Sequence, residues 1–209
     1  MDAAVAAVRV MEDCPLFNAS KGAVFNIEGK NELETSIMLS RPPLSHPEIS
    51  PTRRGIALTL LTRVKNPANL ARALYLSPSS SPHPFLSGAN VEAIAESLGE
   101  TLVDPSYFFT EHRWREHRRG LGLPEEPFPE NGPTALDSFP TGTVGAVALD
   151  SRGCIAAVTS TGGRTNKLVG QMRNGPKWVV VLVLLVSQVR VMVRGLIGGG
   201  RCPEDCLLR

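Results

Sequence analysis

The chain has 209 residues, of which 42% are hydrophobic and 20% are charged, and its formal net charge at pH 7 is +2. A chain of this size and composition can bury the core of one globular domain, and the composition excludes a disordered protein. The small net charge gives little long-range field, which argues against nucleic acid as the partner.

The N-terminal half predicts a helix followed by strands. Apolar residues recur at helical spacing over residues 3–11, but no N-cap residue or lead-in strand precedes this helix. Residues 14–26 and 28–38 predict a loop, a strand, a turn and a second strand, with the turn formed by Gly29 and Asn31.

The next segment predicts a loop and two helices. Residues 40–51 are rich in Pro and Ser, as in a loop. Apolar positions at helical spacing lie on both sides of Asn66-Pro67, where Asn66 can cap a helix and Pro67 can occupy its first turn. The expected elements are apolar helical runs at 56–64 and 68–75, a turn at 77–84, a short apolar step at 85–88 and a helix at 89–98.

Charge and proline dominate residues 102–140. A short helix is expected at 111–119, where a basic run predicts a solvated helix face or loop. The alternative, a nucleic-acid surface, is weaker because no nucleic-acid motif accompanies the run. Residues 121–140 contain five prolines, which predicts a flexible linker.

Two apolar runs then flank Asp150-Ser151-Arg152-Gly153, which predicts a β-hairpin. In antiparallel pairing the start of the first strand lies opposite the end of the second. Thr143 should therefore lie near Thr159 and Thr161. This is either the geometry of a site or simply a threonine-rich hairpin.

The hairpin sequences GTVGAVALD (142–150) and TSTGGRTNKLVG (159–170) resemble the maturation site of the plant-type asparaginase and isoaspartyl peptidase family. These proteins are N-terminal nucleophile hydrolases, in which the chain cuts itself before a threonine. The resemblance spans roughly residues 3–170. It implies an α+β fold, the four-layer αββα sandwich, here incomplete and lacking about the first forty residues of the family.

The resemblance also implies a mechanism. Thr143 Oγ attacks the carbonyl of Gly142, the amide shifts to an ester, and water releases a chain that begins at Thr143. The new α-amine then serves as the base for the threonine hydroxyl. By the same resemblance Thr161 hydrogen-bonds the nucleophile and Asn18 helps to position the scissile carbonyl, while the backbone of Gly162 and Gly163 approaches the substrate.

The loop from Cys14 to Gly22 resembles the family loop whose carbonyl oxygens surround a structural sodium ion. Ser20 stands where the family commonly has glycine, which alters a tight turn. No other metal or cofactor is expected. The last two of the four cysteines, Cys202 and Cys206, lack further ligands for a metal site.

Two features depart from the family. Gln171 and Asn174 replace the arginine and aspartate that hold the substrate, and a neutral glutamine cannot form a bidentate clamp on a carboxylate. An apolar run at 178–186, too short to span a membrane, replaces the oxyanion segment. Our hypothesis is that residues 171–209 are an out-of-frame or intron-derived tail. The expected parts are an α-subunit-like part (1–142), the start of a β-subunit-like part (143–170) and this tail (171–209).

The function implied by the resemblance is amidohydrolysis of asparagine or β-aspartyl bonds, impaired in this chain by the missing groups. The alternatives are a non-catalytic remnant that never cuts itself and a threonine aspartase-type protease. The expected partners are a small-molecule substrate and a second copy in a homodimer, with neither nucleic acid nor membrane. The scattered cysteines and the lack of a signal segment predict a reduced, cytoplasmic protein.

Overall fold

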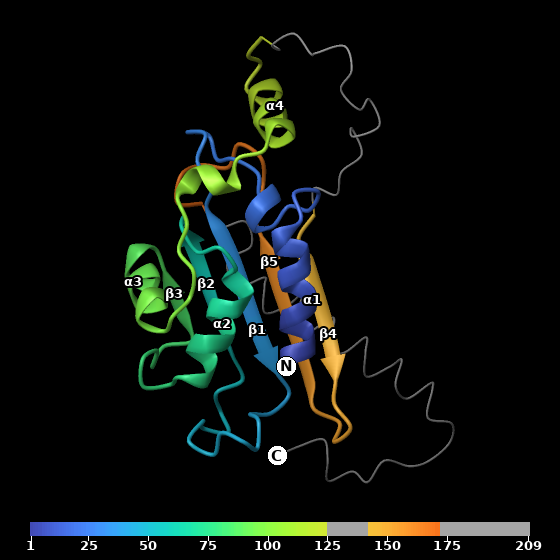
Figure 1. Cartoon of the computed structure of the whole chain (residues 1–209), viewed down its shortest axis with the longest axis vertical. Coiled ribbons are helices and arrows are strands. Elements are labelled where there is room, and N and C mark those ends of the chain that lie inside the picture. The colour runs from blue at the N-terminus through green and yellow to red at the C-terminus, as the bar shows by residue number, and fades with distance from the viewer. Residues whose placement is uncertain (125–141, 172–209) are drawn as a thin grey trace, which may run out of the picture.

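A computed structural model describes residues 1–124 and 142–171 of the chain. Helices and strands alternate along it in a mixed α/β pattern (Figure 1). The elements are α1 (Asp2–Asp13), η1 (Ser20–Gly22), β1 (Leu33–Leu39), β2 (Gly55–Leu61), α2 (Pro67–Leu76), β3 (Phe85–Ser87), α3 (Ala89–Ser97), η2 (Pro105–Phe108), α4 (Glu111–Gly120), β4 (Val144–Leu149) and β5 (Ile155–Thr161).

The five strands form one sheet in the order β3-β2-β1-β5-β4. All neighbours are antiparallel except β2 and β3, which are parallel. β5 is the last strand in the described residues, yet it lies between β1 and β4, and it pairs with β1 from Glu34 opposite Thr161 to Leu39 opposite Ala156. The predicted hairpin is thus confirmed, and its second strand is central in the sheet.

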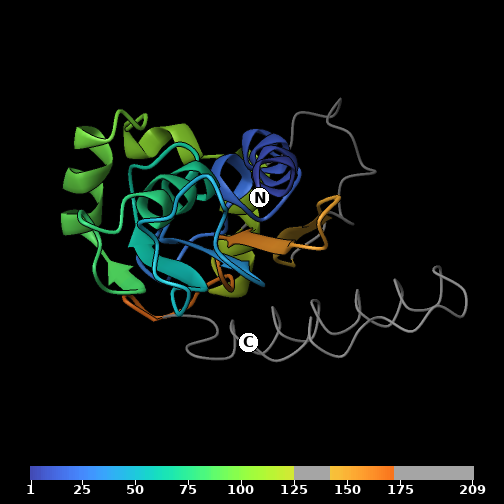
Figure 2. The same ribbon diagram turned by 90° about the horizontal axis from the view of Figure 1, so that it is seen from below.

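Helices α1 and α2 cover one face of this sheet (Figures 1 and 2). α1 packs on β4 and β5, and α2 on β1 and β2. Alternate strand residues such as Ile37 and Val158 are buried in the core with Val8 and Leu74 of the helices. One helix layer on one sheet is half of an αββα arrangement, so the α+β expectation is confirmed for the described residues.

The N-terminus of α2 is where the sequence places it, with Pro67 as the first helical residue. Asn66 holds the N-cap position, but its side chain caps nothing. Its Nδ2 donates to Asp13 Oδ1 at 3.0 Å, and the N–H of Ala68 donates instead to Glu12 Oε1 at 3.0 Å. A carboxylate from another helix therefore takes over the capping role.

The helical spacing expected over residues 56–64 is wrong, because the segment forms β2. The pairing with β1 shifts between Leu33 and Thr35, and Leu60 adopts a left-handed φ of 56°. As a result Leu58 and Leu61, three residues apart, are both fully buried. A bulge thus gave a strand the periodicity of a helix.

The strand expected before residue 26 does not form, because side chains, and not a neighbouring strand, make the hydrogen bonds to the backbone of this segment. Val24 N donates to Asn18 Oδ1 at 3.1 Å, and Asn31 Nδ2 donates to the Val24 carbonyl at 3.2 Å. Asn26 makes only an isolated bridge to Lys167. The turn at Gly29 is closed by Asn26 rather than by Asn31, since Asn26 Oδ1 accepts the N–H groups of the turn.

Helix α4 confirms the element expected at 111–119, but its basic run is not wholly solvated. Arg113 is 1% exposed, and its Nε donates to the Gly22 carbonyl at 2.9 Å. His117 is buried beside Phe25 and Trp114, whose rings pack edge to face with centroids 5.3 Å apart. The run therefore docks α4 on the rest of the domain.

The expected linker beyond residue 124 and the apolar tail with its cysteine pair lie outside the described residues. Within residues 1–124 and 142–171, no helix combines the length and apolar character needed to cross a membrane.

Candidate active site

The hairpin brings the two predicted threonines together through its backbone register. Val144 of β4 pairs with Ser160 of β5, so the same register continued by one residue places Thr143 opposite Thr161. Glu34 of β1 lies on the other side of Thr161. With neighbouring strands about 4.8 Å apart, these three residues form one row across the end of the sheet.

The two ends of this row differ in exposure. Thr161 is fully buried, whereas Thr143 is half-buried and Gly142 is exposed. A Cβ on Gly142 would meet nothing within 4 Å. The Gly142–Thr143 peptide bond is therefore accessible, and its partner threonine is held in the interior.

Asn18 meets Thr161 through the turn that follows β5. Thr161 Oγ1 accepts the N–H of Gly163 at 3.1 Å. Asn18 Nδ2 donates to the Gly163 carbonyl at 2.9 Å, and the Asn18 carbonyl accepts the N–H of Gly162 at 3.1 Å. The structure thus brings the predicted Asn18, Thr161, Gly162 and Gly163 together, and it shows Asn18 holding the turn.

Gly162 is where two backbones meet. A Cβ built on it would lie 2.7 Å from Asn18 Oδ1 and 2.8 Å from Val24 N, closer than real contacts allow. Gly163 has a left-handed φ of 88°, a conformation that favours glycine. The close approach that the structure shows here is between the turn and the Asn18 loop.

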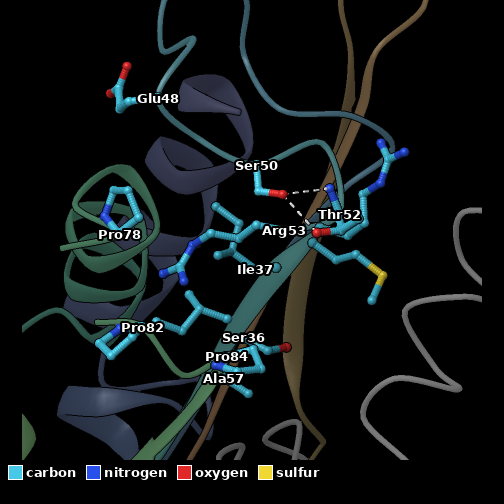
Figure 3. Close-up of a pocket in the computed structure, with 14 residues that line it drawn as sticks. Ser36, Ile37, Glu48, Ser50, Thr52, Arg53, Ala57, Pro78, Pro82 and Pro84 are labelled. Carbon is cyan, nitrogen blue, oxygen red and sulfur yellow. Dashed lines mark hydrogen bonds between the residues drawn. The ribbon is translucent and has the colours of Figure 1, made fainter. Parts of the chain in front are cut away.

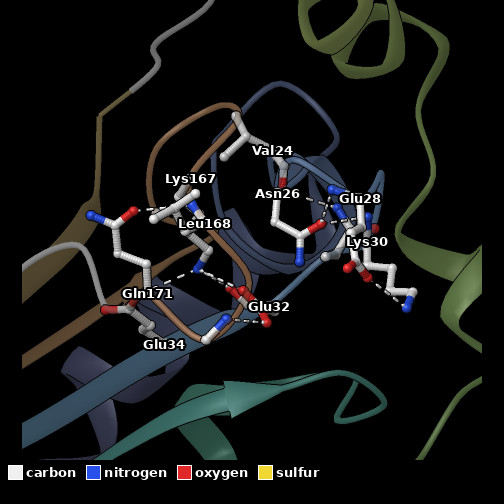
Figure 4. Close-up of polar contacts among 12 residues, drawn as sticks. Val24, Asn26, Glu28, Lys30, Glu32, Glu34, Lys167, Leu168 and Gln171 are labelled. Carbon is white, nitrogen blue, oxygen red and sulfur yellow. Dashed lines mark hydrogen bonds and ion pairs between the residues drawn. The ribbon is translucent and has the colours of Figure 1, made fainter. Parts of the chain in front are cut away.

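A buried ion-pair cluster lies beside this turn (Figure 4). Lys167 is 4% exposed, and its Nζ donates to the Glu32 carbonyl at 2.9 Å and lies 3.5 Å from Glu34 Oε1 and 3.8 Å from Glu32 Oε2. Glu32 Oε1 accepts the N–H of Gly170 at 2.9 Å. Since a buried ammonium requires such partners, the cluster fixes the segment after β5 onto β1.

Sequence reasoning missed this cluster. The available signals were Glu34, a charged residue in a predicted strand, and the lysine of the Asn166-Lys167 pair in the quoted motif. Neither signal gives the contact, because Lys167 lies 135 residues from Glu32.

Hydroxyl groups continue from Thr161 along the sheet. Ser36 Oγ and Thr159 Oγ1 are 2.8 Å apart, and Thr35 Oγ1 donates to the Thr159 carbonyl at 2.8 Å. Thr159 pairs with Gly145, two residues after Thr143. Because side chains alternate along a strand, Thr159 and Thr161 share the face opposite the helices.

A cavity of about 580 Å³ lies farther along the sheet (Figure 3). Its wall includes Ser36, Arg53 and prolines of the 78–84 segment, but none of the predicted site residues. Two guanidinium nitrogens of Arg53 donate to the backbone carbonyls of Ser81 and Leu74, at 2.7 and 3.1 Å. Arg53 therefore supports the wall, and the cavity is separate from the threonine row.

The loop expected to bind sodium has an oxygen-rich interior. A Cβ on Gly22 would lie 2.2 Å from the Phe17 carbonyl oxygen and 2.4 Å from the Pro15 carbonyl oxygen, so the loop packs too tightly around Gly22 to admit a side chain there. Ser20, in the place of a glycine, has a left-handed φ of 44° and donates from Oγ to the Lys65 carbonyl at 2.5 Å. Such neutral oxygen donors fit a hard cation.

The segment after the turn has no charged clamp at the position expected for one. Gln171 Oε1 accepts the N–H of Leu168 at 3.0 Å, and Gln171 N donates to the Leu168 carbonyl at 2.9 Å. The glutamine thus closes its own turn. Asn174 lies outside the described residues.

The family follows from a sequence comparison. The profile of the asparaginase family matches residues 1–176, so this chain belongs to that family, whose members are N-terminal nucleophile hydrolases. The resemblance seen in the hairpin motifs is thereby confirmed.

Three named relatives share between 35% and 38% sequence identity with this chain. The isoaspartyl peptidase/L-asparaginase of Mus musculus is 38% identical over 176 residues, which cover 84% of this chain and 48% of the relative. The isoaspartyl peptidases of Salmonella typhimurium and Escherichia coli are each 35% identical over 176 residues, with 52% and 51% of their lengths covered. The chain spans about half the length of the curated relatives it matches.

Proposed function

We propose that this chain is an amidohydrolase of the asparaginase or β-aspartyl peptidase type that cleaves itself between Gly142 and Thr143. The observation that carries the proposal is the hairpin register, which sets Thr143 opposite the buried Thr161. An exposed Gly142 supports it, because glycine leaves its carbonyl open to attack.

The proposed self-cleavage requires only the chain itself and water, and no cofactor. Thr143 Oγ adds to the Gly142 carbonyl and expels the Thr143 nitrogen, which converts the amide to an ester. Water then hydrolyses the ester, giving a carboxylate on Gly142 and a free α-amine on Thr143. That amine accepts the proton of the neighbouring hydroxyl when a substrate amide is attacked.

The two products should stay together after the cut. β5 pairs with β1 of the first fragment along six residue pairs. Thr165 Oγ1 also donates to Glu116 Oε1 at 3.0 Å, and Asn166 Nδ2 donates to the His117 carbonyl at 3.1 Å. A sodium ion in the Cys14–Gly22 loop is part of the same proposal, and there it would fix the loop that carries Asn18.

The proposed substrates are asparagine and β-aspartyl peptides, in line with the names of the relatives. We propose that hydrolysis is slow in this chain. Gln171, which lacks charge and bonds to its own turn, stands where an arginine would hold the α-carboxylate.

The second candidate is a non-catalytic remnant that never cuts itself, and the same glutamine favours it only in so far as it weakens the hold on a substrate. Intact-mass spectrometry of the purified full chain separates the two. Fragments that end at Gly142 and begin at Thr143 support self-cleavage, and Thr143→Ala must abolish them. A single intact mass after prolonged incubation would support the remnant.

A further inference from the structure

A buried carboxyl lies behind the threonine row, on the helix-covered face of the sheet. Glu12 is the penultimate residue of α1 and is fully buried. Its Oε1 accepts the N–H of Ala68, at the start of α2. Unpaired N–H groups at a helix N-terminus favour such an acceptor, so Glu12 joins the end of α1 to the start of α2.

Ser160 lies on the face of β5 that α1 and α2 cover. It is buried, it lies between Thr159 and Thr161, and it pairs with Thr35 on one side and Val144 on the other. Because side chains alternate, its hydroxyl points to the helices while the threonines point to the opposite face. A shift of Ser160 would therefore also move Thr161. It would change how Thr161 and Thr143 lie opposite each other at this end of the sheet.

Two oxygen atoms of this pair remain unsatisfied. Glu12 Oε2 and Ser160 Oγ are both buried, and neither completes a hydrogen bond of ordinary geometry. Burial raises the pKa of Glu12, and the Ser160 hydroxyl opposes this rise. Of the other groups that act on this carboxyl, Asn66 lowers its pKa and the charge of Asp13 raises it.

A direct hydrogen bond between the two would satisfy both atoms. The hydroxyl donates to an ionised carboxylate, and a neutral carboxyl donates to the hydroxyl, so the bond forms in either protonation state. Leaving both buried groups unpaired is destabilising. A glutamine at position 12 could make the same bond, whereas a leucine could not.

We propose that Glu12 is a positioning residue which holds Ser160, and thereby the end of β5 with Thr161, in register with the Gly142–Thr143 bond. The inference rests on the proposed self-cleavage, because that reaction is what the register serves. Glu12 touches neither the nucleophile nor the scissile bond, and it acts only through Ser160.

A double-mutant cycle on the full chain tests the pair, with the rate of appearance of the fragment that begins at Thr143 as the readout. Ser160→Ala and Glu12→Leu should each slow self-cleavage by about tenfold or more, because small misplacements of reacting groups are costly. The double variant should be no slower than the slower single variant. Glu12→Gln should stay within about threefold of the wild-type rate.

Asp13→Asn is the matched control, since it alters the neighbouring carboxylate, whose partner is Asn66 rather than β5. It should leave the rate unchanged. If Glu12→Leu does not unfold cooperatively, Ser160→Thr is used in place of that variant. Threonine keeps the hydroxyl group, so Ser160→Thr should cleave itself much faster than Ser160→Ala.

The outcomes separate this inference from the proposed function. Two results would overturn the positioning role alone, provided that the wild type yields the fragments. The first is a normal cleavage rate in Ser160→Ala. The second is a double variant in which the effects of the two single substitutions multiply. Absence of fragments from the wild type overturns the proposed self-cleavage and, with it, the positioning role.

Discussion

The proposed nucleophile side and the proposed substrate side of the site are built in different ways. Thr143 and Thr161 are placed by strand register, which backbone hydrogen bonds of β4, β5 and β1 maintain. The substrate side depends on the side chain at position 171, and there a glutamine bonds to its own turn. A site placed by backbone pairing tolerates changes in neighbouring side chains, whereas a charged clamp is lost with one substitution.

The largest expected effect is on the ion-pair cluster that attaches the substrate side to β1. Lys167→Met removes the ammonium from two buried carboxylates, which should lower the free energy of unfolding by about 3–5 kcal/mol. Chemical denaturation measures this loss. Lys30→Met is the control, because the ion pair of Lys30 with Glu28 is exposed, and it should change little. Equal effects of the two substitutions would show that the cluster does not stabilise the site.

The pH dependence of stability should report the carboxyl behind the nucleophile side. Burial raises the pKa of Glu12 from 4.5 to about 7, despite the opposing effects of Ser160 and Ala68. The folded protein therefore holds a proton that the unfolded chain has lost between these pH values, so stability falls as pH rises from 4.5 to 7. A shift of this size corresponds to about 3 kcal/mol.

Thermal unfolding between pH 5 and 8 tests this prediction. The midpoint of wild type should fall with rising pH more steeply than that of Glu12→Gln, whose side chain does not ionise. Asp13→Asn should keep most of the wild-type slope, because the charge of Asp13 is the smallest of the causes that shift the pKa of Glu12. Parallel curves for wild type and Glu12→Gln would rule out Glu12 as the source.

A smaller loss of stability is expected from a substitution at Gly162, where the turn after β5 meets the Asn18 loop. Gly162→Ala places a methyl group 2.7 Å from Asn18 Oδ1, and such overpacking should cost about 1–3 kcal/mol. Gly142→Ala meets no atom within 4 Å and should be neutral in stability. Unfolding midpoints of both variants, each made in a Thr143→Ala background that prevents cleavage, provide the comparison. A neutral Gly162→Ala would show that the Asn18 loop yields easily.

The smallest effect should come from restoring a single charge on the substrate side. Gln171→Arg supplies one guanidinium, which should raise β-aspartyl dipeptide hydrolysis by up to about tenfold. Gln171→Lys is the control, because a point charge lacks the paired geometry of a guanidinium. Release of free aspartate measures both. If neither variant exceeds wild type, the clamp is not the limiting defect.

Local patterns allowed much of the fold to be predicted. Apolar spacing located α1, α2 and α3, and a turn sequence between two apolar runs located the hairpin and its opposed threonines. The same reasoning failed at β2, because the bulge at Leu60 gave that strand a helical spacing. Periodicity records burial, and a bulge changes burial without changing the type of element.

Local sequence patterns could not predict the long-range polar contacts. The partners Glu12 and Ser160 lie on different elements, as do Lys167 and Glu34, and no local pattern pairs them. Arg113 and His117 belong to a run that seemed solvated by composition, yet both are buried against the N-terminal loops. The sequence motifs thus located the proposed reacting groups, while the side chains that hold the surrounding segments in place became visible only in three dimensions.

The central place of β5 also bears on how the chain folds during synthesis. β1 has β2 as a neighbour early, but its other edge stays without a strand until residues 155–161 emerge from the ribosome. An open strand edge readily pairs with other chains, and pairing across such a sequence separation is slow. The nascent chain thus carries an aggregation-prone edge from the synthesis of β1 until that of β5, and the threonine strand is the segment that closes it.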